Sequence, residues 1–204
     1  MDRRGGAAVW VGLALVALLG AAWWYASTRP VVVVRNALAL PAMVRINGGV
    51  PERIPAGGTR EYPVPRNTLV SVEWEMERST TRGGVPVGNG IGASLMLPEP
   101  SGRVSHVLRP MRGDTAFFAP LITNATGRPL TVRINDGLAG AVDCPCEVPP
   151  GAARLPVGYY RLYRNSTVAV QDSSGRRAMF RDLGPEVDPV SGAVGLRFEA
   201  GDLR

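Results

Sequence analysis

The 204-residue sequence contains no lysine, so all 23 of its basic residues are arginine. Without lysine the chain can form no lysine Schiff base and has no lysine general base. The sequence places neither a nucleophile nor an orienting acid beside its single histidine, His106. We therefore expect no catalytic residues, no enzyme activity and no cofactor.

The sequence also lacks a basic run interleaved with aromatic residues. Its arginines are scattered, with pairs only at 3–4 and 176–177, although the net charge is +6. Nucleic-acid-binding proteins gather basic residues on one face or along one element. We expect no nucleic-acid partner, and we expect the arginines to face other proteins or an anionic surface.

Charge is absent from residues 7–26, which read AAVWVGLALVALLGAAWWYA. A helix of twenty residues is about 30 Å long, the thickness of the hydrocarbon core of a bilayer. This predicts an uncleaved signal anchor, a single-pass transmembrane helix in contact with lipid. Aromatic residues mark its two interfaces: Trp10, Trp23, Trp24 and Tyr25. The alternative is a cleaved secretory signal with small residues at 20–22.

Arginines at positions 3 and 4 precede this segment, which favours an N-terminus on the inner side and places the bulk of the chain in the periplasm, at a bacterial inner membrane. One face of the helix carries small residues at spacings of four, which would let another helix pack closely. These are Ala8, Gly12, Val16 and Gly20.

The remainder contains an internal duplication. Residues 36–50 match 124–138 at a separation of 88 positions, 54–57 match 148–151 at 94, and 66–73 match 164–171 at 98. The blocks keep their order, and the separation grows only where loops are inserted. The pattern shows a duplicated unit and does not indicate its function.

Each copy has the features of an all-β unit. Glycine and proline are abundant, with 25 and 18 residues, and short alternating runs are separated by turn residues. In residues 68–76, for example, Val70, Val72, Trp74 and Met76 share one face. We predict two tandem immunoglobulin-like antiparallel β-sandwiches after the anchor. The predicted ranges are 1–30 for the tail and anchor, 31–108 for repeat 1, 109–115 for a linker and 116–204 for repeat 2.

The only cysteines, Cys144 and Cys146, lie in a loop expansion that the first copy lacks. They could form a local disulfide, remain simple loop thiols, or bind a soft metal with Asp143 or Glu147 as weaker ligands. Two cysteines and one distant histidine make an incomplete zinc site, so we expect no metal. A local disulfide or loop thiols fit the sequence better.

A glycine-rich stretch at 79–94 has no phosphate-loop pattern. Its apolar residues Val85, Val87 and Ile91 are suited to contact a partner protein.

These features favour a non-enzymatic, membrane-anchored scaffolding subunit that docks onto other components of an inner-membrane complex. One alternative is a periplasmic thiol-redox or soft-metal-handling protein that works through Cys144 and Cys146. Another is an envelope glycan-binding module, which would need an exposed aromatic platform.

Overall fold

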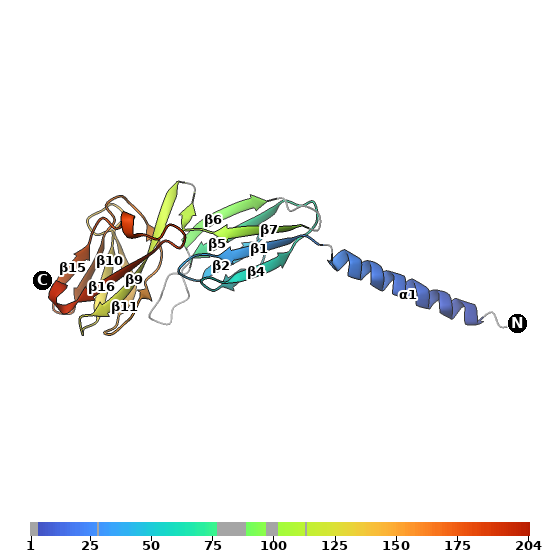
Figure 1. The fold of residues 1–204 in the computed structure, drawn as a ribbon, viewed down its shortest axis with the longest axis horizontal. Coiled ribbons are helices and arrows are strands. Elements are labelled where there is room, and N and C mark those ends of the chain that lie inside the picture. Colours follow the sequence, from blue (N-terminus) through green and yellow to red (C-terminus); the bar gives the residue numbers. More distant parts are fainter. Residues whose placement is uncertain (1–3, 28, 77–88, 97–101, 113) are drawn as a thin grey trace.

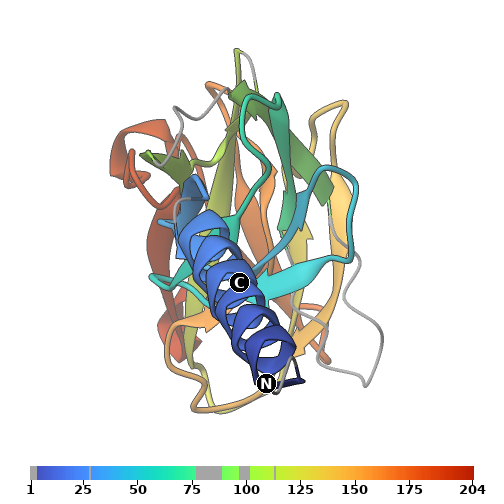
Figure 2. The ribbon, with the colours of Figure 1, turned by 90° about the vertical axis from the view of Figure 1, so that its right-hand side faces the viewer.

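The computed structural model describes residues 4–27, 29–76, 89–96, 102–112 and 114–204. The described residues form one N-terminal helix, α1 (Arg4–Ser27), followed by sixteen strands and two short 3-10 helices. Figure 1 shows α1 at one end of an elongated molecule and the C-terminus at the other. Figure 2, turned by 90°, shows the helix projecting away from the strands towards the viewer.

The described residues of the first β unit form seven strands in two sheets. They are β1 (Val31–Asn36), β2 (Ala42–Ile46), β3 (Glu52–Ile54), β4 (Thr59–Pro63), β5 (Val70–Met76), β6 (Asn89–Met96) and β7 (Arg103–Leu108). The sheets have the orders β4-β1-β7 and β3-β2-β5-β6. The alternation predicted for β5 is confirmed, since its four apolar residues are buried and contribute to the core between the sheets.

The second β unit follows a short strand, β8 (Met111–Arg112). It contains β9 (Thr115–Ala125), β10 (Leu130–Ile134), β11 (Val142–Val148), β12 (Leu155–Pro156), β13 (Tyr160–Arg161), β14 (Val168–Asp172), β15 (Arg177–Phe180), η1 (Gly184–Glu186), β16 (Ala193–Glu199) and η2 (Ala200–Asp202). One sheet has the order β11-β10-β14-β15, and in the other β9 pairs with β12, β13 and β16. This unit has its own apolar core.

Both units repeat one hydrogen-bonding motif at the end of their first strand. The amide nitrogen of Asn36 lies 3.0–3.1 Å from three carbonyl oxygens, and its Oδ1 accepts from the N–H two residues later. Asn124 makes the same set of contacts 88 positions later, at 2.7–3.1 Å. Both asparagines are fully buried. The hydrogen bonds of each side-chain amide satisfy its buried polar atoms and hold the end of the first strand to the loops beside it.

The sheet register shows which residues of the two units correspond. Ile46 pairs with Val72 in the first unit, and Ile134 pairs with Val168 in the second. The strands β5 and β14 therefore correspond at a separation of 96 positions, whereas their sequences match at 98. A slip of two residues is one full repeat of the pleat, so the apolar residues still face inwards.

The predicted immunoglobulin-like, antiparallel sandwich needs correction. The first and last strands of each unit pair in parallel: β1 with β7, and β9 with β16. In each unit the chain therefore runs in the same direction along its first and last strands, and these two strands lie side by side. The described fold is mostly β-strand, in several small sheets behind one helix.

The predicted transmembrane anchor is also corrected. Within the described part of the chain no helix meets the combined length and apolarity that a membrane crossing requires. The single-pass signal anchor, the inner-membrane location and the periplasmic placement predicted from residues 7–26 are therefore not supported.

Candidate functional site

Cys144 and Cys146 form a disulfide within β11, with their Cα atoms 5.1 Å apart. Both side chains are buried and belong to the core of the second unit. Residues two apart in a strand point to the same face, which brings the two sulfurs together on the inner side of the sheet.

The disulfide lies in a β-bulge of strand β11. Thr131 pairs with Glu147 and Arg133 pairs with Asp143, so one residue of β10 lies opposite the three residues 144–146 of β11. The central residue of the three is proline in the sequence. Proline has no N–H for the ladder and is tolerated in a strand at a bulge. The part of the loop expansion from residue 142 onwards therefore lies inside a strand.

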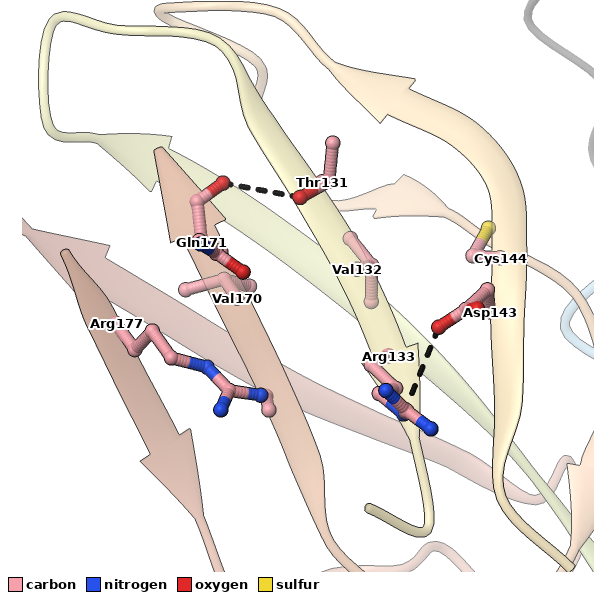
Figure 3. Close-up of a pocket in the computed structure, with 9 residues that line it drawn as sticks. Thr131, Val132, Arg133, Asp143, Cys144, Val170, Gln171 and Arg177 are labelled. Atoms are coloured by element: carbon pink, nitrogen blue, oxygen red, sulfur yellow. Dashed lines mark hydrogen bonds and ion pairs between the residues drawn. The ribbon is translucent and has the colours of Figure 1, made fainter. Parts of the chain in front are cut away.

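A shallow pocket of about 280 Å³ lies over this bulge (Figure 3). Arg133 extends from β10 towards Asp143 on β11, with Nε and Oδ1 3.5 Å apart. Arg133 and Arg177 also each lie 3.0 Å from a carboxylate oxygen of Asp136. The two guanidinium groups that face the pocket are therefore already paired with carboxylates of the same unit.

The bonded sulfurs offer no thiolate to a metal. In the described ranges, no three or more His, Cys, Asp and Glu side chains gather into a group that could hold a metal ion. Asp143 is exposed on the outer face of the sheet, whereas the two sulfurs face inwards. The residues named for a soft-metal site therefore do not converge.

A second pocket, of about 420 Å³, lies beside β5 and β7, which belong to different sheets of the first unit. It is lined by Trp74, Ser105, His106, Val107, Arg109 and Met111. The rings of Trp74 on β5 and His106 on β7 are 5.1 Å apart, centroid to centroid. Trp74 Nε1 and His106 Nε2 are buried and have no hydrogen-bond partner among the described residues. Buried polar atoms of this kind normally have a partner.

The second unit has apolar residues at both of these positions. Trp74 lies opposite Val44, and Val170 lies opposite the corresponding Val132. By the same registers, His106 corresponds to Leu196, which is buried in the second core. The first unit thus carries two nitrogen-bearing rings where its copy has only aliphatic side chains.

Burial lowers the pKa of His106 below its usual value. The unfolded chain therefore binds more protons than the folded chain between the folded pKa and about 6.5. We expect the free energy of unfolding to fall as the pH drops below about 6.5 through this window. Urea titrations at several pH values should show the effect, and the His106→Leu variant should lose that part of the pH dependence. An unchanged profile in the variant would contradict this assignment.

Tyr159 joins the two units. It precedes β13 of the second unit, yet it is 1% exposed and belongs to the core cluster of the first. Its hydroxyl accepts a hydrogen bond from the Ala39 N–H at 2.7 Å and donates one to the carbonyl of Ser191. Burial raises the pKa of Tyr159, so the hydroxyl keeps the proton that it donates. Nothing in the sequence distinguishes this tyrosine from its neighbour Tyr160.

The residues predicted to act in the helix lie along its exposed surface. Trp10, Trp23, Trp24 and Val16 are all exposed, and a Cβ added at Gly12 or Gly20 would meet no atom within 4 Å. The guanidinium of Arg66, in the first unit, lies 5.5 Å from the centre of the Trp24 ring. The side chains of Ala8, Tyr25 and Ile91, and all of Val85 and Val87, fall outside the described residues.

Comparison with known proteins finds no family model and no curated protein that matches this chain.

Proposed function

We propose that the chain is a non-enzymatic docking subunit, which α1 fixes to another protein component of a larger assembly. The observation that carries this proposal is the apolar surface of α1. From residue 10 to residue 24 the sequence has no polar or charged side chain. The large side chains in this stretch are 54–78% exposed and point in all directions around the helix.

A helix that is apolar all round is normally buried. Each large aliphatic or aromatic side chain contributes about 1.5–3 kcal/mol when it is fully removed from water. Nine such side chains of α1 are exposed, from Trp10 to Trp24, so covering them is worth on the order of 10–20 kcal/mol before ordering costs. A partner that surrounds this helix would bind tightly.

The small residues of α1 indicate the side of the helix that a partner can approach most closely. Gly12 and Gly20 leave open space beside the helix backbone, and Val16 lies between them on the same face. Small side chains allow two helix backbones to approach closely. A helix of the partner that lies along this face would contact the backbone of α1 directly.

The β units follow α1 and would be held at the partner's surface. The contact between Arg66 and Trp24 links the helix to the first unit, and Tyr159 links the first unit to the second. A subunit built in this way can hold two β surfaces at a fixed position in an assembly.

Leucine in place of the small residues should disrupt docking. In a Gly12→Leu/Gly20→Leu double variant the added side chains separate the helices, and we expect about tenfold less partner, which corresponds to ~1.4 kcal/mol. The full chain would be tagged at its C-terminus and crosslinked in the cells that produce it. The recovered partner would then be quantified by mass spectrometry.

The matched control is Ala14→Leu/Ala21→Leu, because these residues lie on the opposite side of α1. This variant adds the same two side chains and should retain the partner. Equal recovery from both variants would contradict docking through the small-residue face. Crosslinking to lipid alone, without a protein at a fixed ratio, would contradict the docking function itself.

The described geometry does not favour the two alternatives. A thiol-redox role needs accessible sulfurs, whereas Cys144 and Cys146 are buried in the core. A glycan-binding module needs an exposed aromatic platform, whereas Trp74, the one tryptophan outside α1, is buried.

A further inference from the structure

The two β units differ at one cross-strand pair on the outer face of a sheet. In the first unit, Arg45 of β2 lies directly opposite Glu73 of β5. In the second unit, Arg133 of β10 lies directly opposite Ala169 of β14. Opposite charges at facing positions of two antiparallel strands attract each other. The second unit therefore keeps the arginine but lacks the carboxylate that lies opposite it in the first unit.

The next outward-facing position of the same strand differs in the same way. Glu75 of β5 corresponds to Gln171 of β14, because they pair with Met43 and Thr131 at equivalent positions of the two registers. On this face the second unit thus has an alanine and a neutral amide where the first unit has two carboxylates. Alanine is also much smaller than glutamate, so the difference removes volume as well as charge.

The pocket of about 280 Å³ in the second unit lies at these positions (Figure 3). Ala169 and Gln171 line it together with Arg133 and with Arg177, which pairs with Gln171 from β15. One carboxylate, that of Asp136, lies 3.0 Å from both guanidinium groups and so holds the two arginines side by side. The missing glutamate side chain therefore coincides with an open space between held arginines.

The charged residues that line the pocket have a positive balance, because they are two arginines and Asp143. The Asp143 side chain is 80% exposed, and its carboxylate lies 3.5 Å from Arg133 Nε. Arg133 contacts Asp136 through the same Nε, and Arg177 contacts Asp136 through Nη2. A guanidinium has five N–H donors, so both arginines keep donors that these contacts do not use.

We propose that this pocket binds a small organic carboxylate, which takes the place of the glutamate side chain that faces the arginine in the first unit. The carboxylate accepts hydrogen bonds from Arg133 and Arg177, and the short aliphatic part of the acid lies over Ala169. Hydrogen bonds between a guanidinium and a carboxylate are about twice as strong as those between neutral groups. The volume is slightly below the usual range of about 300–1,000 Å³ for small-molecule sites, which suits an acid of a few carbon atoms.

Propionate tests this site, because it reproduces a glutamate side chain from Cβ outwards. It would be titrated at constant ionic strength into the full, ¹⁵N-labelled chain, and the backbone N–H signals of Thr131 and Gln171 would be followed by NMR. We expect both signals to shift saturably at millimolar concentrations. Propionamide, which has the same shape without the charge, should bind at least tenfold more weakly.

Two variants of the second unit and a matched control in the first locate the binding. Arg133→Gln should weaken binding of propionate about tenfold, and Ala169→Glu, which copies the first unit, should abolish it. Arg45→Gln removes the equivalent arginine of the first unit and should leave binding unchanged. Equal shifts with propionate and propionamide would overturn the proposal, and so would unchanged binding in Arg133→Gln.

The source of the carboxylate is tested with a blocked tripeptide that has a central glutamate. Tighter binding of this peptide than of propionate would overturn the assignment to a small acid and would identify an acidic side chain of a protein as the occupant. The experiment does not involve α1, so its result is independent of whether the helix docks onto a partner.

Discussion

Replacing Tyr159 by alanine should lower the free energy of unfolding by about 3–5 kcal/mol, the range for removing a buried aromatic side chain. The side chain comes from the second unit and is buried in the core of the first. Its loss should therefore leave a cavity in one unit and separate the two units. Urea-induced unfolding measures the first effect. Small-angle X-ray scattering measures the second, as a larger radius of gyration.

Two matched variants separate packing from hydrogen bonding. Tyr159→Phe keeps the ring and removes the acceptor of the Ala39 N–H, which should cost about 1–3 kcal/mol without separating the units. Tyr160→Phe removes a hydroxyl that bonds to the Val157 carbonyl within the second unit and should leave the scattering unchanged. If Tyr159→Ala unfolded at the same urea concentration as the parent chain, Tyr159 would not be the link between the units.

The position of the Tyr159 side chain also could not be predicted from the sequence. The alternation in β5 and the turn residues after β2 and β10 are local patterns, so the sequence was enough to predict strands and their buried faces. In the pair Tyr159-Tyr160 the two side chains point to different cores. That choice depends on how the units sit together, which no local pattern reports.

For the cysteine segment, the sequence shows that residues are inserted but does not show which structure they adopt. Its insertion relative to the first copy is visible in the sequence, but an insertion predicts a loop, whereas the structure places both cysteines and their neighbours inside β11. A β-bulge lets a strand take in extra residues and continue, and the register of β10 with β11 shifts at this point. The interpretation of residues 7–26 failed for a different reason. The length of the uncharged stretch and its aromatic ends predicted a membrane span, whereas among the described residues no helix meets the requirements of length and apolarity.

The pocket beside Trp74 and His106 could be predicted only in part from the sequence. The alternation along each strand predicts that Trp74 faces the core and that His106 is a half-buried strand residue. Only the sheet registers show that Val170 and Leu196 occupy the same positions in the second unit. The sequence alignment of the third block, shifted by two residues, would have matched Trp74 with Asp172 instead.

The duplicated asparagines give the second large expected effect. Asn36→Ala should lower the free energy of unfolding by about 3–4 kcal/mol, because it leaves one buried N–H and several carbonyls without partners. Asn124→Ala removes the same contacts from the second unit and should cost a similar amount. Chemical unfolding of each variant, with a probe in each unit, would show which unit is destabilised first.

Asn47→Ala is the control, because Asn47 is exposed and its Oδ1 accepts a single hydrogen bond, from Ser71 N–H at 2.8 Å. Its backbone φ of 51° also favours asparagine over alanine, so the combined cost should be about 1 kcal/mol. A duplicated fold that depends on its buried asparagines must lose much more at position 36 or 124 than at position 47. Should Asn36→Ala and Asn47→Ala prove equally mild, the shared fold of the two units would rest on their apolar cores alone, and the asparagine motif would be a remnant of duplication without energetic weight.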